Sequence, residues 1–514
     1  MINKKLFWLV LLCSLFIFIS GLTSDLSLGD EVSHYRFAKD TFNSGRRAPF
    51  DSLYGTGNPP GYFFNSAPLW HILLAITWKL SGGISFPVAQ LYHTIYYALL
   101  IIFTYLLGKE IYSQKEGMYA ALVVATIPAI DTFSVLFYID VPATTLSVLC
   151  LFLIVRRQFL LSGIVLGLVY LTKRNAFFFA PAFFFLVLYL SKPGIIEKIK
   201  SSLLFFVSVF LIILPDMLWR EHNLTLTKFI NGRETVIPTT AVYRGILDRL
   251  DLKDWTLRTS EYLNSSFLSF TDIIKYFGIV LLILLAIYLI LRLYEKKDII
   301  LLLPIICYFF LFCYMFYPGS DIRYLLPAMP LLAVLFSKVL AKNYFNKKWI
   351  KIAILTLCFL QFFGTVLFVR AKRQIPEGIK EGFTYLRENT DPNTLIIYPE
   401  YVILENTNRR FVWAGTIRPI LENLFWNRDE NEVKNLLYAN EIEYIVVKKS
   451  RIYDDSKAQH FGGYPKSFVE RLPELSFVKL VFENDDMSIW YIPVPNSSNE
   501  DKLNLDEKES TVEN

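Results

Sequence analysis

Long apolar blocks, with clusters of lysine and arginine in alternate connections between them, restrict this chain to a narrow class of folds. Of its 514 residues, 54% are hydrophobic and 16% aromatic, and the apolar residues come in continuous runs. A membrane-spanning helix needs about 20 mostly apolar residues. We therefore predict a polytopic α-helical membrane protein with about eleven transmembrane helices. The expected spans are 6–22, 87–107, 117–133, 141–155, 158–173, 176–191, 202–219, 272–293, 299–317, 323–341 and 350–369.

The charges between these spans predict the orientation of the chain. Basic clusters such as Lys4-Lys5, Arg156-Arg157 and Lys296-Lys297 fall in alternate connections, and positive residues favour the cytoplasmic side. We therefore expect a multi-pass protein of the cell membrane with a cytoplasmic N-terminus. The same rule explains the net charge of +6 without a nucleic-acid partner.

A change of composition near Ile375 marks a second region. We predict a membrane domain over residues 1–370, a small extracytoplasmic α/β domain over 371–495 and a disordered acidic tail over 496–514. Within the α/β domain we expect a helix, two strands and a terminal hairpin. These are Pro376–Asn389, Thr394–Tyr398, Glu443–Val447, and Val478–Phe482 paired with Ser488–Ile492.

Two adjacent acids, Asp30 and Glu31, follow the first span by a few residues. They fall in the first turn of an expected helix, where the helix dipole favours negative charge. An acidic helix start at a membrane surface is common, so the pair alone does not define a site. Further along the same outer loop the sequence Asn58-Pro59-Pro60-Gly61-Tyr62 precedes a short apolar run with His71, which we expect to lie in the membrane interface.

Three more charged features fall on the predicted outer face at the ends of spans. They are Asp140, the pair Lys173-Arg174, and Asp321 with Arg323. Each alone is compatible with a helix-end anchor or a structural ion pair. Together they suit group transfer from a lipid-linked phosphate. A carboxylate can take a proton from an acceptor hydroxyl, and arginine can hold the leaving phosphate with two parallel bonds.

The chain resembles the GT-C fold glycosyltransferases, nearest to the branch with protein O-mannosyltransferases and the lipid A aminoarabinose transferase. The resemblance spans about residues 1–370 and rests on short motifs in a common order. These are Asp30-Glu31, Asn58–Tyr62 with Pro68-Leu69-Trp70, Asp140-Val141-Pro142, Gly167-Leu168 to Lys173, and Arg323–Pro330. The large inserted sugar-recognition domain of the mannosyltransferase branch has no counterpart here, which leaves the acceptor class open.

The resemblance implies transfer of a sugar from a polyprenyl (dolichyl or undecaprenyl) phosphate to a protein, lipid or glycan acceptor on the outer face, with inversion. It assigns catalytic roles to Asp30, Glu31 and Asp140 and a phosphate-binding role to Arg323. We add Lys173 and Arg174 as helpers at the phosphate. We expect Asn58, Tyr62 and His71 in the loop that contacts donor or acceptor. Some relatives bind a divalent cation, and Asp30, Glu31 and Asp140 would hold one here, although the sequence does not require it.

Two other function classes remain. A transporter or flippase of lipid-linked sugars usually places ionisable groups near the middle of its spans. In this chain the charged features lie at span ends on one side. A non-catalytic assembly or receptor protein would not need acids and bases on a common face.

Overall fold

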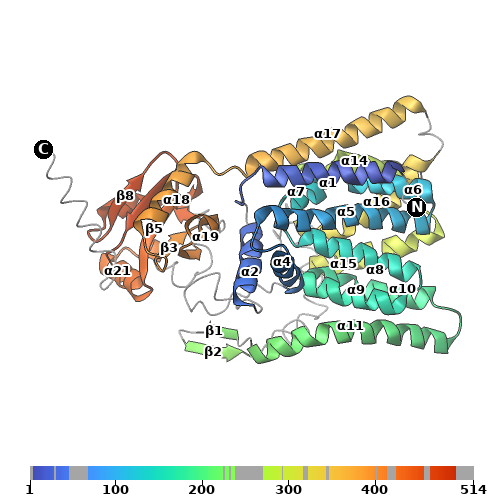
Figure 1. Cartoon of the computed structure of the whole chain (residues 1–514), viewed down its shortest axis with the longest axis horizontal. Coiled ribbons are helices and arrows are strands. Elements are labelled where there is room, and N and C mark those ends of the chain that lie inside the picture. Colours follow the sequence, from blue (N-terminus) through green and yellow to red (C-terminus); the bar gives the residue numbers. More distant parts are fainter. Residues whose placement is uncertain are drawn as a thin grey trace. The chain divides into compact units, whose positions relative to one another are not determined.

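The computed structural model describes most of the chain in two compact units (Figure 1). The first unit comprises Met1–Ser24 with Asn65–Lys372, and the second comprises Asp25–Phe64 with Arg373–Asn514. The described residues are 4–27, 30–45, 67–223, 226–230, 233–237, 270–291, 293–315, 322–342, 347–400, 402–413, 424–455 and 463–493. Asn58, Tyr62, Asp321 and the predicted tail 496–514 lie outside them. The domain boundaries at residues 370 and 495 stay predictions.

In the residues that the structure describes, the first unit is helical apart from one short hairpin. Its α-helices are α1 (Lys4–Leu22), α4 (Leu69–Leu80), α5 (Phe86–Ile111), α6 (Gln114–Val124), α7 (Pro128–Val135), α8 (Asp140–Val155), α9 (Phe159–Thr172), α10 (Ala180–Leu190), α11 (Ile195–Asn223), α14 (Phe270–Ile290), α15 (Ile299–Met315), α16 (Met329–Ala341) and α17 (Lys348–Lys372). Its 3-10 helices are η1 (Arg174–Phe179), η3 (Lys296–Asp298) and η4 (Ile322–Ala328). The hairpin is formed by antiparallel β1 (Leu226–Ile230) and β2 (Arg233–Ile237).

Each predicted span overlaps a helix or a pair of helices in this unit. Among the described residues, five helices are long and apolar enough to cross a membrane, or six if α6 and α7 form one bent span. α8, α9, the η1–α10 segment and the second part of α14 are apolar but shorter. The count of eleven spans therefore stays a prediction, as does the interfacial position of α4.

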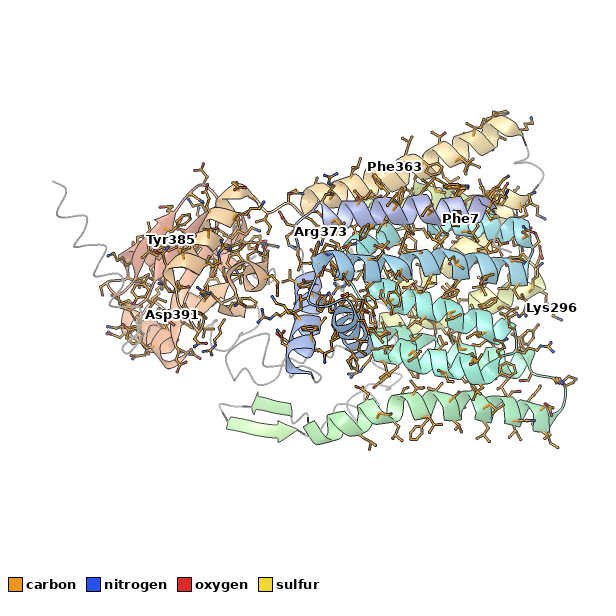
Figure 2. The ribbon with its side chains drawn as sticks, in the orientation of Figure 1. Phe7, Lys296, Phe363, Arg373, Tyr385 and Asp391 are labelled. Atoms are coloured by element: carbon orange, nitrogen blue, oxygen red, sulfur yellow. The ribbon has the colours of Figure 1, made fainter. Side chains whose placement is uncertain are left out.

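The outer surfaces of α1, α11 and α17 are apolar. Phe7 of α1 and Phe363 of α17 are 52% and 41% exposed (Figure 2), and Leu211 of α11 is 60% exposed. Large apolar side chains on long helices favour contact with lipid rather than water. This pattern is that of a multi-pass membrane protein.

Two spans are interrupted, and one side chain contacts both interruptions. α6 and α7 meet at a bend of 59° before Pro128, and α14 is kinked at Gly278, whose φ is 77°. Gln361 of α17 donates a hydrogen bond to the carbonyl of Thr126 at the first break and accepts one from the backbone N–H of Val280 beside the second. Such side-chain bonds satisfy backbone groups that an interrupted helix leaves free.

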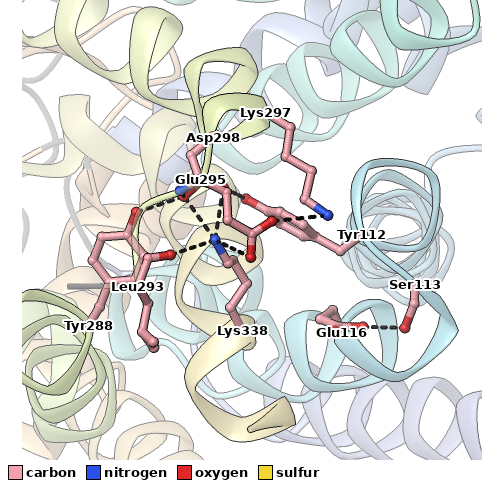
Figure 3. A network of polar contacts seen from close by, with 9 residues as sticks. All are labelled: Tyr112, Ser113, Glu116, Tyr288, Leu293, Glu295, Lys297, Asp298 and Lys338. Atoms are coloured by element: carbon pink, nitrogen blue, oxygen red, sulfur yellow. Dashed lines mark hydrogen bonds and ion pairs between the residues drawn. The ribbon is translucent and has the colours of Figure 1, made fainter. Parts of the chain in front are cut away.

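A buried ion network joins the connections at the ends of α5, α14 and α16 (Figure 3). Lys338 Nζ lies 2.9 Å from Asp298 Oδ2 and 2.7 Å from the carbonyl oxygen of Leu293. The hydroxyls of Tyr112 and Tyr288 donate to the two oxygens of Asp298 at 2.6 and 2.8 Å. Both charges are buried, and these partners satisfy them.

The second unit is built on a five-stranded sheet with the order β4-β3-β5-β9-β8. The strands are β3 (Leu395–Tyr398), β4 (Arg410–Trp413), β5 (Ile442–Lys448), β8 (Lys479–Glu483) and β9 (Met487–Tyr491). β3 runs parallel to β4 and β5, while β9 runs antiparallel to β5 and β8. The other elements are α2 (Asp30–Ser44), α18 (Glu377–Asn389), α19 (Val402–Thr407), α21 (Glu430–Ala439), η6 (Lys449–Arg451), β6 (Ile452–Tyr453), β7 (Tyr464–Pro465), α23 (Lys466–Arg471) and η7 (Leu472–Glu474).

Helices cover both faces of this sheet. Ile396 of β3 belongs to a core with α18 and α19, and Ile397 belongs to a second core with α21 and α23. This follows from the alternation of side chains along a strand. Val32 and Phe37 of α2 lie in the first of these cores. The helix that begins with Asp30 is therefore part of the α/β unit.

Candidate functional site

Arg323 occupies the short helix η4 of the first unit, between two tyrosine rings. Its guanidinium carbon lies 5.0 Å from the ring centre of Tyr138 and 5.1 Å from that of Tyr324. Its Nη2 is 3.4 Å from the Tyr324 hydroxyl. Cation–π contacts of this kind fix the orientation of the guanidinium group. The hydroxyl of Tyr308 donates to the carbonyl of Tyr324 at 2.6 Å, which holds η4 in place.

Lys173 and Asp140 form an ion pair beside Arg323. Lys173 is the residue that ends α9, and Asp140 begins α8, where it is 1% exposed. Lys173 Nζ also lies 4.8 Å from the centre of the Tyr324 ring. One ring therefore contacts both cations, and the structure brings together three of the predicted residues. The second oxygen of Asp140 is buried and has no hydrogen-bond partner among the described residues.

Arg174 follows Lys173 but pairs with a residue that the sequence analysis missed. Its Nη2 is 3.6 Å from Asp216 Oδ2, and its guanidinium lies 5.5 Å from the ring centre of Tyr170. Asp216 is buried within α11. A carboxylate inside the apolar run 202–219 is expensive without a partner, and this is the signal that would have identified it. Among the described residues, the cluster contains the cations Lys173, Arg174 and Arg323 and the carboxylates Asp140 and Asp216.

An apolar cavity of about 390 Å³ lies between α14, α15, η4 and α16. Among the described residues, the side chains that line it are apolar: Phe277, Leu281, Leu282, Leu285, Ile305, Ile306, Phe309, Leu325, Ala328, Leu332 and Phe336. Leu325 and Ala328 belong to η4. The helix that carries Arg323 thus also forms part of the cavity wall.

Asp30 and Glu31 lie in the second unit, whereas Asp140, Lys173 and Arg323 lie in the first. That these residues form one catalytic site remains a prediction. Both oxygens of Glu31 are engaged by Arg373, with Nη2–Oε2 at 2.9 Å and Nε–Oε1 at 3.3 Å. The backbone N–H of Ser27 also donates to Glu31 at 2.9 Å, and the Ser27 hydroxyl donates to the carbonyl of Arg373 at 2.6 Å. Glu31 thereby ties the start of α2 to Ser27 and Arg373.

His71 is buried in α4 and lies among aromatic rings. Its Nδ1 is 3.2 Å from the carbonyl oxygen of Ala67, and its ring packs edge-on against Trp70. In the part of the chain that the structure describes, no group of three or more His, Cys, Asp and Glu side chains is arranged to hold a metal ion. Asp140 and Glu31 are each paired with a cation, so they fit a divalent ion poorly.

Comparisons with known proteins identify the fold. Residues 65–219 match the model of the dolichyl-phosphate-mannose-protein mannosyltransferase family. Among curated proteins, no sequence match is found.

Several solved structures match most or almost all of the chain. ArnT from Cupriavidus metallidurans, bound to undecaprenyl phosphate, is 12% identical, with a TM-score of 0.65 over 95% of this chain and 98% of its own. The oligosaccharyltransferase of Archaeoglobus fulgidus, in the apo form, is 13% identical, with a TM-score of 0.62 over 96% of this chain and 76% of its own. The archaeal oligosaccharyltransferase AglB from Archaeoglobus fulgidus, in complex with an inhibitory peptide and a dolichol-phosphate, is 15% identical. Its TM-score is 0.52 over 87% of this chain and 70% of its own. These matches confirm the resemblance read from the sequence: the chain has the GT-C fold of these glycosyltransferases.

Proposed function

We propose that this chain is an integral-membrane glycosyltransferase that moves a sugar from a polyprenyl phosphate to a protein, lipid or glycan acceptor. The main observation behind the proposal is that η4 contributes both to the cationic cluster and to the wall of the apolar cavity. This helix holds Arg323 beside Lys173 and Asp140, and it also lines an apolar cavity. A polyprenyl phosphate has the same two parts, an anionic head and an apolar chain.

In this proposal Arg323 holds the phosphate through two N–H groups, and Lys173 and Arg174 add positive charge. The isoprenoid chain occupies the cavity lined by Leu281, Ile305 and Leu325. The ligands named for two of the structural neighbours, undecaprenyl phosphate and dolichol-phosphate, support this assignment.

Asp30 is the proposed general base. It takes the proton from an acceptor hydroxyl while the hydroxyl oxygen attacks the anomeric carbon from the side opposite the phosphate. The bond from that carbon to the phosphate oxygen breaks, and its electron pair leaves with the phosphate held by Arg323. Attack from the opposite side inverts the anomeric centre. Asp140 orients the acceptor, and the loop with Asn58 and Tyr62, together with His71 of α4, contacts donor or acceptor.

The proposal places the reaction on the outer face, with the N-terminus cytoplasmic and the second unit outside. A reporter fused after Val369 tests this orientation. Activity of a periplasmic or extracellular reporter supports it, and activity of a cytoplasmic reporter alone contradicts it.

Binding of the donor lipid tests the phosphate site. Undecaprenyl phosphate is added to the purified full chain, and bound lipid is measured by native mass spectrometry. We expect Arg323→Lys to lower the affinity about tenfold or more, roughly 1.4 kcal/mol, because an ammonium group cannot replace the planar fork of arginine. The control is Arg156→Lys, since Arg156 is half exposed and pairs with Glu110. Equal binding by parent and Arg323→Lys would make Arg323 an anchor at the membrane surface.

A flippase for lipid-linked sugars is the second candidate, and one observation favours it. Asp131 is fully buried in α7, directly after the bend between α6 and α7, and accepts a hydrogen bond of 3.3 Å from Tyr97. Ionisable groups at broken spans are typical of transporters. Reconstituted vesicles distinguish the two: a flippase moves the lipid-linked sugar across the bilayer without an acceptor, whereas a transferase consumes it only when an acceptor is present.

A further inference from the structure

The sheet of the second unit contains a topological switch point between β3 and β5. These neighbouring strands are parallel, so their carboxyl ends meet at one edge. After β3 the chain continues into α19, which packs on one face with Val402 and Ile403. After β5 it continues to α23, which packs on the opposite face through Phe468. Where the connections of adjacent parallel strands diverge in this way, a crevice forms that commonly binds ligands.

A charged cluster occupies this edge. Glu400 lies two residues past β3, Lys448 ends β5, and Arg451 follows in η6. Lys448 Nζ is 2.8 Å from Glu400 Oε2, and Arg451 Nε is 2.7 Å from Glu400 Oε1. Each oxygen of Glu400 thus fixes one cation. The cluster retains one positive charge in excess.

The partners of Arg451 orient its guanidinium group but do not use all of its hydrogen-bond donors. Its Nη1 donates to the Tyr453 hydroxyl at 2.9 Å, and its side chain is 40% exposed. Nε and Nη1 account for its contacts among the described residues, which leaves Nη2 to face a further acceptor. An arginine held in one orientation loses less entropy on binding an anion than a free one does.

A buried hydroxyl, two residues before Glu400 in the sequence, has no hydrogen-bond partner in the part of the chain that the structure describes. Tyr398 is the last residue of β3, and its side chain is fully buried. Its hydroxyl has no hydrogen-bond partner among the described residues. Burial raises the pKa of Tyr398 well above its ordinary value, the charge of Glu400 adds to this rise, and the charge of Arg451 opposes it. Buried polar groups without partners are rare and need an explanation, and a ligand atom is one.

We propose that this edge of the sheet, formed by Tyr398, Glu400, Lys448 and Arg451, binds a small ligand with a phosphate or carboxylate group. Arg451 and Lys448 hold the anion, Glu400 orients both cations, and the Tyr398 hydroxyl donates to a ligand oxygen. The site goes beyond the proposed sugar transfer and does not depend on it. A phosphorylated sugar and a uronic acid are two sources of such a group.

Isothermal titration calorimetry on the purified full chain tests the site with glucose 1-phosphate, glucuronate and glucose as probes. We expect one or both anionic sugars to bind and glucose not to bind. Arg451→Gln should lower the affinity for the anionic probe about tenfold or more. Lys466→Gln is the matched control, because Lys466 pairs with Glu470 on the same unit and is mostly exposed. The difference between the phosphate and carboxylate probes identifies the group.

Tyr398→Phe provides an independent check that does not require the ligand. Removing a hydroxyl that lacks a partner among the described residues should leave the unliganded protein equally or more stable. It should also lower the affinity for the anionic probe several-fold. Absence of binding by both anionic sugars at millimolar concentration, or unchanged affinity in Arg451→Gln, overturns the proposal. Binding of undecaprenyl phosphate to the same variants is measured in parallel. A failure of the anion site is then distinguished from a failure of the proposed transferase function.

Discussion

Glu31 and Arg373, which are 342 positions apart, form an ion pair in which neither side chain is exposed to solvent. Arg373 opens the second segment of the α/β unit, and Glu31 lies in the first turn of α2. Nearby, the carboxylate of Asp25 accepts a hydrogen bond of 2.8 Å from the backbone N–H of Ile375. The pair therefore fastens the segment that carries Asp30 to the start of the α/β unit.

This relationship predicts a large stability loss for Glu31→Gln. The substitution removes the carboxylate charge that pairs with the buried guanidinium of Arg373, which costs about 3–5 kcal/mol. Thermal and denaturant unfolding of the purified chain measure the effect. The control is Lys380→Gln, which removes a half-exposed partner of Asp25 and should cost less than about 1 kcal/mol. Equal stability of Glu31→Gln and the parent would show that the pair does not hold α2.

The network around Lys338 gives a second prediction, in the membrane unit. Asp298→Asn removes the fully buried one of the two carboxylates that pair with Lys338, the other being Glu295, and we expect a loss of about 3 kcal/mol. Lys297→Gln is the matched control, because Lys297 pairs with Glu295 at the exposed rim of the same network. Both variants are heated in detergent, and the fraction of protein that stays monodisperse is measured. Similar behaviour of the two would mean that the buried pair contributes no more than the exposed one.

A pH dependence is expected for the contact between α21 and the segment before β8. The hydroxyl and the backbone N–H of Ser476 donate to Glu430 at 2.5 and 2.7 Å and lower the pKa of Glu430 below its ordinary value of 4.5. A lowered pKa stabilises the folded state above the unfolded-state pKa, and this contribution is lost as the pH falls through the folded-state pKa. The parent should therefore be more stable than Glu430→Gln at pH 7, and the difference should shrink below about pH 4.5. A difference that is constant from pH 7 to pH 3 contradicts the assignment.

Much of this architecture could be read from the sequence, because hydropathy and turn residues act locally. The runs that predict spans coincide with helices, and the strands expected at Thr394–Tyr398 and Glu443–Val447 coincide with β3 and β5. The proximity of Lys173, Asp140 and Arg323 followed from placing helix ends on one face. Tyr324 is the element that joins them, and a tyrosine in an apolar run carries no local signal of that role.

The placement of α2 could not be predicted in the same way. Asp30 and Glu31 follow the first span in sequence, which suggested that they belong to the membrane domain. Val32 and Phe37 instead pack in the α/β core, and the partner of Glu31 lies far along the chain. Such long-range contacts leave no trace in local periodicity. For the same reason the sequence did not reveal Asp216 as the partner of Arg174.

Mass spectrometry of envelope glycans and glycoproteins tests the central claim, that this chain transfers a sugar from a polyprenyl phosphate. Cells that carry the parent, a deletion, Asp30→Asn or Arg156→Lys are compared, together with their lipid-linked sugars. Loss of a proton-transfer group typically costs about 10²–10⁴ in rate. We predict that the deletion and Asp30→Asn lose the same sugar modification and accumulate its polyprenyl-phosphate form, while Arg156→Lys matches the parent. An unchanged glycan and glycoprotein profile in the deletion strain, or full modification in Asp30→Asn cells that express the protein at parent levels, would contradict the account.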